Sequence, residues 1–141
     1  MTDDNGKIDE LKNLGFSEMA ANAWVKANGK CAYCGADLLQ NMATYYCGVT
    51  EHILPKSKYE NRENEILNAA LSCIDCNQIK GQWDPNEGGK IVEGNDPLTQ
   101  DQREKLIERV KDYIQEEDRK TKHVNDFEKA RAIIRVEKNE E

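Results

Sequence analysis

Cys31-Ala32-Tyr33-Cys34 and Cys73-Ile74-Asp75-Cys76 are two cysteine pairs separated by 38 residues in a chain of 141. In each pair two residues lie between the cysteines, a spacing that lets two thiolates on a tight turn bind one tetrahedral metal ion. Thiolates are the soft donors that zinc prefers, and four of them leave no coordination position for water. We therefore predict one structural zinc ion and a subdomain inserted between the pairs. Its four ligands would be Cys31, Cys34, Cys73 and Cys76.

The cysteine content favours a metal site over disulfides. The chain has five cysteines, so disulfide pairing would leave one unpaired, and its first residues contain no apolar stretch typical of a secretory signal. No apolar run approaches the roughly 20 residues that a membrane span needs. From these features we expect a cytoplasmic protein without a membrane segment.

The fifth cysteine, Cys47, lies in a segment rich in β-branched and aromatic residues, Thr44–Val49. Such a composition is typical of a strand, and a cysteine in a strand is most often a buried, inert thiol. We expect that role for Cys47. A redox function or a fifth metal ligand is the alternative.

The composition predicts a small apolar core and an acidic surface. Hydrophobic residues make up 38% of the chain and the mean hydropathy is −0.88, so the apolar core is expected to be small and a metal ion useful for stability. The net charge is −7. A chain this acidic is unlike proteins that grip nucleic acid over a large basic face, although local phosphate contacts or delivery by a partner remain compatible with it.

The pattern of elements predicts an α+β fold in which a small core is flanked by helices at both ends. Ser17 is expected to cap a helix over residues 18–28, and short strands are expected over residues 44–50 and 52–54, with Pro55 ending the second. We divide the chain into a helical N-terminal segment (1–29), a metal-stapled core (30–83), a loop (84–98) and a C-terminal helical hairpin (99–141).

From residue 66 onward, four helical or turn segments are predicted. A helix or turn is expected over residues 66–71 and a short helix over 76–81. Thr99 and Gln102 have the spacing of a capping box that opens a longer helix. A last helix is expected to begin near Asn125, and both long helices have apolar stripes that we expect to be packed. The stripes are Leu106, Ile107, Val110, Tyr113 and Ile114 in the first, and Phe127, Ala130, Ile133 and Ile134 in the second.

Three further blocks stand in register with the cysteines: Glu51-His52-Ile53-Leu54-Pro55, Asn68 five residues before Cys73, and Asn77-Gln78-Ile79-Lys80 after Cys76. With them, residues 30–81 resemble the HNH endonuclease family, in which zinc-knuckle members place a ββα-metal core between two cysteine pairs. The resemblance implies hydrolysis of DNA phosphodiester bonds to 3′-hydroxyl and 5′-phosphate ends.

The chemistry of the insert agrees with that resemblance. Phosphodiester hydrolysis needs a deprotonated water near neutral pH, and histidine, with an ordinary pKa of about 6.5, is the side chain suited to accept that proton. The chain has two histidines, and His52 lies in the insert whereas His123 lies near the C-terminus. The resemblance implies that His52 is the general base and that Asn68 holds the base and its strand in register. It further implies that Glu51, where aspartate is commoner, and Asn77 bind Mg²⁺ or Mn²⁺.

Four cations surround the proposed site in sequence, and we expect them to contact substrate phosphates: Lys56, Lys58, Arg62 and Lys80. The expected partner is DNA, with a possible protein partner in a defence or mobile-element system. The principal alternative is a non-catalytic, zinc-stapled module that binds nucleic acid or protein. A redox or zinc-storage protein is a third interpretation, which the inserted subdomain does not favour.

Overall fold

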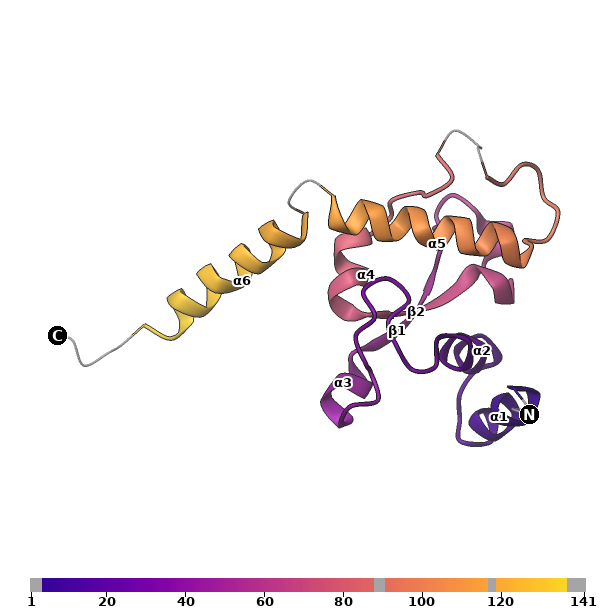
Figure 1. The fold of residues 1–141 in the computed structure, drawn as a ribbon, viewed down its shortest axis with the longest axis horizontal. Coiled ribbons are helices and arrows are strands. Elements are labelled where there is room, and N and C mark those ends of the chain that lie inside the picture. The colour runs from indigo at the N-terminus through magenta and orange to yellow at the C-terminus, as the bar shows by residue number, and fades with distance from the viewer. Residues whose placement is uncertain (1–3, 88–90, 117–118, 137–141) are drawn as a thin grey trace.

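The computed structural model describes residues 4–87, 91–116 and 119–136. Helices surround one two-stranded antiparallel sheet, so the α+β class predicted from the sequence is confirmed. Figure 1 shows the sheet at the centre, with α5 crossing one side of it and α6 extending beyond the body. The elements are α1 (Asp4–Asn13), α2 (Glu18–Ala27), α3 (Met42–Tyr46), β1 (Gly48–His52), two 3₁₀ turns (Glu60–Arg62 and Ile66–Asn68), β2 (Ala69–Cys73), α4 (Ile74–Lys80), α5 (Gln100–Gln115) and α6 (Arg119–Ile134).

The sheet and α4 form a ββα unit. β1 pairs with β2 in a register that sets Gly48 opposite Cys73 and His52 opposite Ala69. The ladder continues one step beyond β1, because the Ile53 amide donates to the Asn68 carbonyl at 2.8 Å. α4 follows β2 without a loop and contacts both strands. The end of β1, the start of β2 and one helix face are thereby held together.

The N-terminal helices form as the sequence predicts. The Ser17 side chain accepts a hydrogen bond from the Ala20 amide, and α2 ends where Asn28 adopts a left-handed conformation with φ 54°. α2 packs against β2. At the junction with the sheet, a Cβ atom on Gly48 would lie 2.6 Å from the Trp24 ring, so the close approach of this helix to β1 requires glycine there.

The predicted strand over residues 44–50 is wrong in its first half. Asn41 and Thr44 form a reciprocal capping box, which begins α3 and overrides the strand preference of Thr44, Tyr45 and Tyr46. The strand starts only at Gly48. Cys47 lies at the C-terminal cap of α3 and is exposed, so the expectation of a buried thiol is also wrong.

The predicted helix or turn over residues 66–71 is correct only for its first three residues. Ile66–Asn68 is a 3₁₀ turn, and β2 begins at Ala69. β2 is buried on both faces from Ala69 to Ser72, so its sequence lacks the alternation that marks a half-exposed strand. Periodicity alone therefore could not identify it.

α5 confirms the predicted capping box and apolar stripe. Thr99 and Gln102 bond reciprocally to each other's backbone, and Leu106, Val110 and Ile114 are fully buried. These three side chains pack in the main core beside Ile53 and Leu54. Trp83 stacks on Tyr113 with ring centroids 4.1 Å apart. α5 thus covers the segment that follows His52.

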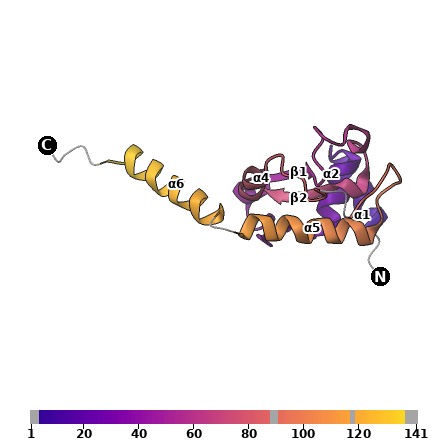
Figure 2. The same ribbon diagram turned by 90° about the horizontal axis from the view of Figure 1, so that it is seen from above.

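The last helix differs from the prediction in its start and its packing. α6 begins at Arg119, six residues before Asn125, and its predicted stripe is exposed: Phe127 is 58%, Ile133 75% and Ile134 78% accessible. The expectation that this helix packs through its stripe is wrong. Both ribbon views show α6 leaving the body at the end of α5 (Figures 1 and 2). Within the described ranges, no helix combines the length and apolar character needed to cross a membrane.

Candidate metal centre and hydrolytic site

The four predicted zinc ligands come together in the structure. The Sγ atoms of the two cysteine pairs all lie within 4.8 Å of one another, and Cys34 Sγ is 3.8 Å from Cys73 Sγ. Four tetrahedral Zn–S bonds of about 2.3 Å would separate the sulfurs by about 3.8 Å, so the group fits zinc. The first pair lies on the turn after α2, and the second joins β2 to α4. One ion would therefore pin α4 to the segment that follows α2. The four ligands are Cys31, Cys34, Cys73 and Cys76.

The clustered thiols alter one another's pKa. Hydrogen bonds from Cys73 and Cys76 lower the pKa of Cys31, whereas the bond to Cys31 raises the pKa of Cys73 to about 11 and raises that of Cys76 further. One sulfur is thus stabilised as a thiolate by protons held on its neighbours. A dication replaces those protons as the counter-charge for all four sulfurs.

His52 ends β1 and is half-buried. One ring nitrogen, Nε2, lies 2.8 Å from the backbone carbonyl of Glu63. A carbonyl can only accept a hydrogen bond, so Nε2 carries the proton and Nδ1 of the neutral ring has the free lone pair. The loop after β1 therefore holds the imidazole in an orientation that leaves Nδ1 able to accept a proton.

Asn68 is fully buried and brackets the segment that follows His52. Its Oδ1 accepts from the Leu54 amide at 2.8 Å, while its Nδ2 donates to the Leu54 carbonyl at 3.1 Å and to the Arg62 carbonyl at 3.4 Å. The side-chain amide thereby acts as an extra strand partner for Leu54. It joins the segment after β1 to the loop that supplies the Glu63 carbonyl.

Glu51 points into the interior, opposite to its neighbour along β1. Its Oε1 lies 3.3 Å from Lys80 Nζ and its Oε2 accepts a hydrogen bond from the Tyr33 hydroxyl. Lys80 also donates to the His52 carbonyl at 3.1 Å. Burial raises the pKa of Glu51, and the attraction of Lys80 opposes that rise. The three side chains form a buried triad beneath the end of β1 (Tyr33, Glu51, Lys80).

This triad bears directly on the predicted second metal. Both carboxylate oxygens of Glu51 are engaged, its side chain is 7% exposed, and the neighbouring ammonium of Lys80 occupies the position that a cation would need. Glu51 therefore does not fit the role of a metal ligand as it is arranged here. Asn77 lies half-buried on α4, one turn before Lys80. Within the described residues, the four cysteines are the one cluster of three or more Cys, His, Asp or Glu side chains close enough to hold an ion.

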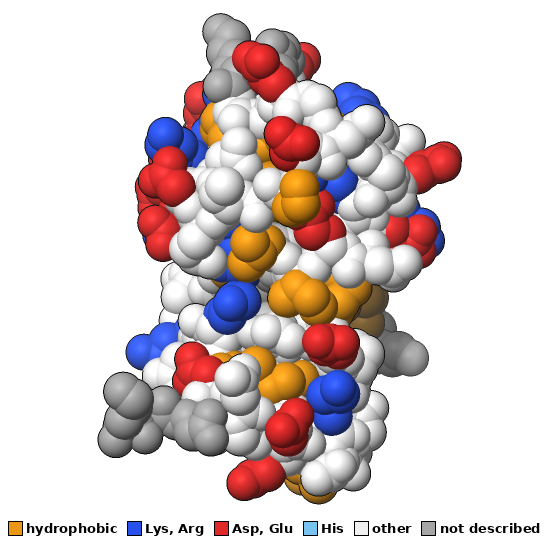
Figure 3. All heavy atoms as spheres, turned by 90° about the vertical axis from the view of Figure 1, so that its right-hand side faces the viewer, with side chains coloured by type: hydrophobic (Ala, Val, Ile, Leu, Met, Phe, Trp, Pro, Cys, Tyr) orange, Lys and Arg blue, Asp and Glu red, His pale blue; other side chains and the backbone are white. Residues whose placement is uncertain are grey.

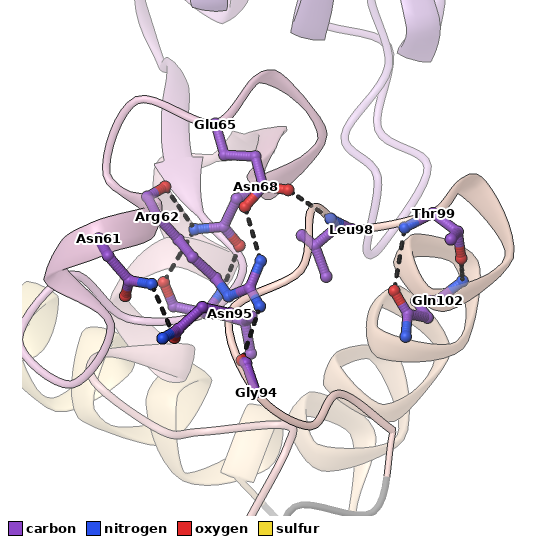
Figure 4. A network of polar contacts seen from close by, with 10 residues as sticks. Asn61, Arg62, Glu65, Asn68, Gly94, Asn95, Leu98, Thr99 and Gln102 are labelled. Carbon is purple, nitrogen blue, oxygen red and sulfur yellow. Dashed lines mark hydrogen bonds and ion pairs between the residues drawn. The ribbon is translucent and has the colours of Figure 1, made fainter.

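The four predicted phosphate contacts divide into two groups. Arg62 and Lys80 are each 2% exposed and bond to interior groups. Arg62 bonds to Glu65 at 2.8 Å and to the Gly94 carbonyl at 3.1 Å, which ties the loop after β1 to the segment before α5 (Figure 4). Lys56 and Lys58 are exposed, and Lys56 pairs with Glu63 at 3.0 Å. Only these two can meet a ligand from solvent in this arrangement.

The sequence analysis missed two buried residues near the site. Tyr33 stands between the cysteines of the first pair, where either intervening residue could have faced the core, and burial together with Glu51 raises its pKa well above the ordinary value. Arg103 reaches from α5 to the Ala69 carbonyl at 2.9 Å, opposite His52 in the sheet. Its place on the buried face of α5 follows from helical spacing, because it lies three residues before Leu106. Its partner depends on the tertiary fold.

Comparison with protein families gives one match. Residues 31–82 match the family model described as HNH endonuclease, which includes both cysteine pairs and all residues between them. The search of curated proteins and the search of solved structures each gave no match.

Proposed function

Residues 31–82 form a domain of the HNH endonuclease family, and on this basis we propose that the protein hydrolyses DNA phosphodiester bonds with His52 as the general base. The observation that carries the proposal is the contact between His52 Nε2 and the Glu63 carbonyl at 2.8 Å. It leaves Nδ1 as a proton acceptor on a ring whose ordinary pKa is near neutrality.

In the proposed reaction, Nδ1 of His52 takes a proton from a water molecule while the water oxygen attacks phosphorus. The bond from phosphorus to the 3′ oxygen breaks, and this oxygen takes a proton from solvent. The products are a 3′-hydroxyl and a 5′-phosphate. Asn68 and Lys80 act as positioning residues, because one holds Leu54 and the other holds the His52 carbonyl. Lys56 and Lys58 are the proposed phosphate contacts.

A divalent ion, Mg²⁺ or Mn²⁺, would supply charge neutralisation at the phosphate if it is bound. Asn77 is the remaining candidate to hold it through a side-chain carbonyl oxygen, because Glu51 is committed to Lys80 and Tyr33. We therefore derive no step from Glu51 as a ligand. A series of Mg²⁺ and Mn²⁺ concentrations, measured on Asn77→Ala and on Glu51→Gln, tests which of the two residues affects the metal requirement.

Plasmid nicking tests the assignment of the base. We expect His52→Ala to lose activity by about 10²–10⁴-fold, the usual contribution of a general base, while zinc content stays at one ion per chain. Asn64→Ala is the matched control, because this exposed side chain lies in the same loop as Glu63 and outside the proposed machinery. Equal nicking by the wild type and His52→Ala would overturn the role of His52.

The second candidate is a zinc-stapled binding module that does not cleave its ligand. The four-cysteine cluster suits this function equally, since it requires only a stable scaffold. The oriented His52 ring favours the nuclease, because a scaffold has no need of a free Nδ1. Binding of DNA without any cleavage across the Mg²⁺ and Mn²⁺ series would support the module. For either function we also propose a protein partner and a location in the cytoplasm, where thiols remain reduced.

A further inference from the structure

α6 differs in charge from the rest of the chain. Its 16 residues carry five Lys and Arg against two Asp and Glu, a net charge of +3. The whole chain carries −7, so the other 125 residues carry −10. Among the helices in the described ranges, α6 alone has a positive net charge. Positive charge is therefore concentrated on one element.

The same helix is exposed along its length. From residue 122 to 136 no described side chain is buried, and the helix projects from the body in both ribbon views (Figures 1 and 2). Near its start, His123 pairs with Asp75, which lies on α4 between two zinc ligands. α6 is thus joined to the helix that also carries Asn77. Among its described cations, Lys122 pairs with Asp126 and Arg131 pairs with Glu128, and both pairs are exposed. Exposed pairs of this kind are weak, so these cations can exchange their partners for phosphates.

The arrangement of side chains around α6 suits a polyanion. Arg131 and Arg135 lie four residues apart, and the Arg135 amide continues the helical turn to the Arg131 carbonyl at 2.9 Å. Lys122 and Lys129 lie seven residues apart on another side. The exposed apolar residues Phe127 and Ile134 stand between the two pairs. Cations on both sides of an apolar strip match phosphates on both sides of a row of sugars and bases.

The hydrolytic site offers little positive charge of its own. Arg62 and Lys80 are buried, which leaves Lys56 and Lys58 as the exposed cations of the four predicted phosphate contacts. A chain of net charge −7 repels a polyanion unless a local basic surface captures it. We propose that α6 is a nucleic-acid-binding arm that captures duplex DNA for the HNH domain. This inference rests on the proposed nuclease function, which it deepens by naming the binding surface.

A second copy of the chain suits α6 less well than DNA as a binding partner. Pairing α6 with α6 would set +3 against +3. The apolar pocket of about 420 Å³ near Leu11, Phe16 and Trp24 lies between α1 and α2, at the opposite end of the molecule from α6, so α6 does not reach it within one chain (Figure 1). The face at that end mixes acidic, basic and hydrophobic side chains (Figure 3).

Fluorescence anisotropy tests the proposal with the full-length, zinc-loaded protein and a labelled 20-base-pair duplex, without added Mg²⁺ or Mn²⁺ so that no cleavage occurs. The test variant is Lys129→Gln/Arg131→Gln/Arg135→Gln. The matched control, Lys7→Gln/Lys12→Gln/Lys26→Gln, removes the same charge from exposed residues of α1 and α2. If each of the three substituted cations meets one phosphate, raising salt from 50 to 200 mM should weaken wild-type binding about 40-fold more than it weakens binding by the test variant. The control should behave like the wild type.

Two results would overturn the proposal: binding by the test variant that equals the wild type, or an equal loss in the control variant. A third result would also overturn it: the wild type is a dimer in solution, and Phe127→Ser/Ile134→Ser makes it monomeric without changing DNA binding. α6 would then be a protein interface. The nuclease proposal is judged separately by plasmid nicking. If the test variant loses DNA binding but the wild type never nicks plasmid, the α6 inference is supported and the nuclease proposal is refuted.

Discussion

Lys80 Nζ lies 3.3 Å from Glu51 Oε1 in the interior of the protein, where the two side chains are 1% and 7% exposed. The pair joins the last turn of α4 to the end of β1, next to His52. Charges removed from water are costly unless each has a partner, and the additional bonds from Tyr33 to Glu51 and from Lys80 to the His52 carbonyl complete the set. The backbone at the proposed base therefore depends on an ion pair beneath it.

Replacing Lys80 with methionine should be strongly destabilising. The change keeps most of the side-chain volume but leaves the Glu51 carboxylate buried without a counter-charge, so we expect a loss of about 3–5 kcal/mol in the free energy of unfolding. The double variant Lys80→Met/Glu51→Gln should recover part of that loss. Urea denaturation of zinc-loaded protein measures both. Lys26→Met, at an exposed position of α2, is the control, expected within about 0.5 kcal/mol of the wild type. If the free energy of unfolding of Lys80→Met equals that of this control, Glu51 does not need Lys80 as its buried counter-charge.

The Tyr33 hydroxyl should make stability fall at alkaline pH. Burial and the nearby Glu51 charge raise the pKa of Tyr33 well above 10, whereas in the unfolded chain it ionises near 10. Above pH 10 the unfolded state releases this proton and the folded state retains it, so the free energy of unfolding decreases as pH rises, by up to about 1.4 kcal/mol per pH unit.

The variant Tyr33→Phe isolates this contribution. It loses the hydrogen bond to Glu51, so it should be less stable at pH 7 by about 1.5–3 kcal/mol, but its stability should fall less steeply between pH 9 and 11. Urea unfolding at several pH values compares the two proteins. Parallel curves for the wild type and Tyr33→Phe would show that the hydroxyl does not stay protonated in the fold.

The hydrogen bonds between the Asn68 side chain and the Leu54 backbone should support activity only by positioning the segment that follows His52. In Asn68→Asp the donor to the Leu54 and Arg62 carbonyls becomes an acceptor, so two attractive contacts become repulsive. We expect a loss of about 2–3 kcal/mol in stability and lower nicking activity, with unchanged zinc content. Thermal unfolding, metal analysis and the plasmid assay measure these effects. The exposed Asn64→Asp is the control. Full activity in a folded Asn68→Asp protein would remove Asn68 from the positioning of His52.

Zinc removal should unfold the middle of the chain. The ion would tie the turn after α2 to the junction of β2 and α4, in addition to the Tyr33 bond to Glu51 and the bond from the Ala32 amide to the Leu71 carbonyl at 2.8 Å. Without it, four thiols would remain clustered in a core that is small. Cys73→Ser should lose zinc and cooperative unfolding, whereas Cys47→Ser should keep both, because Cys47 is exposed and outside the cluster. Circular dichroism and metal analysis are the measurements. Secondary structure that persists after complete zinc removal would disprove a structural role for the metal.

The sequence by itself determined the features that depend on local chemistry and spacing. Two cysteine pairs predicted the metal cluster, Ser17 and Thr99 predicted two helix starts, and the blocks around His52, Asn68 and Asn77 identified the family domain. Each of these signals lies within a few neighbouring residues, whose caps, turns and ligand spacing operate whatever the rest of the chain does.

Only the tertiary structure decided which side chains face one another across elements. β1 places Glu51 toward Lys80 and Tyr33 and so withdraws it from the predicted metal role, while packing buries Arg62 and leaves the apolar stripe of α6 exposed. The buried strand β2 and the short helix α3 also escaped prediction. The physical reason is that burial and ion pairing depend on residues distant in sequence, so a charge that looks available in the sequence can be neutralised by a partner that only folding supplies.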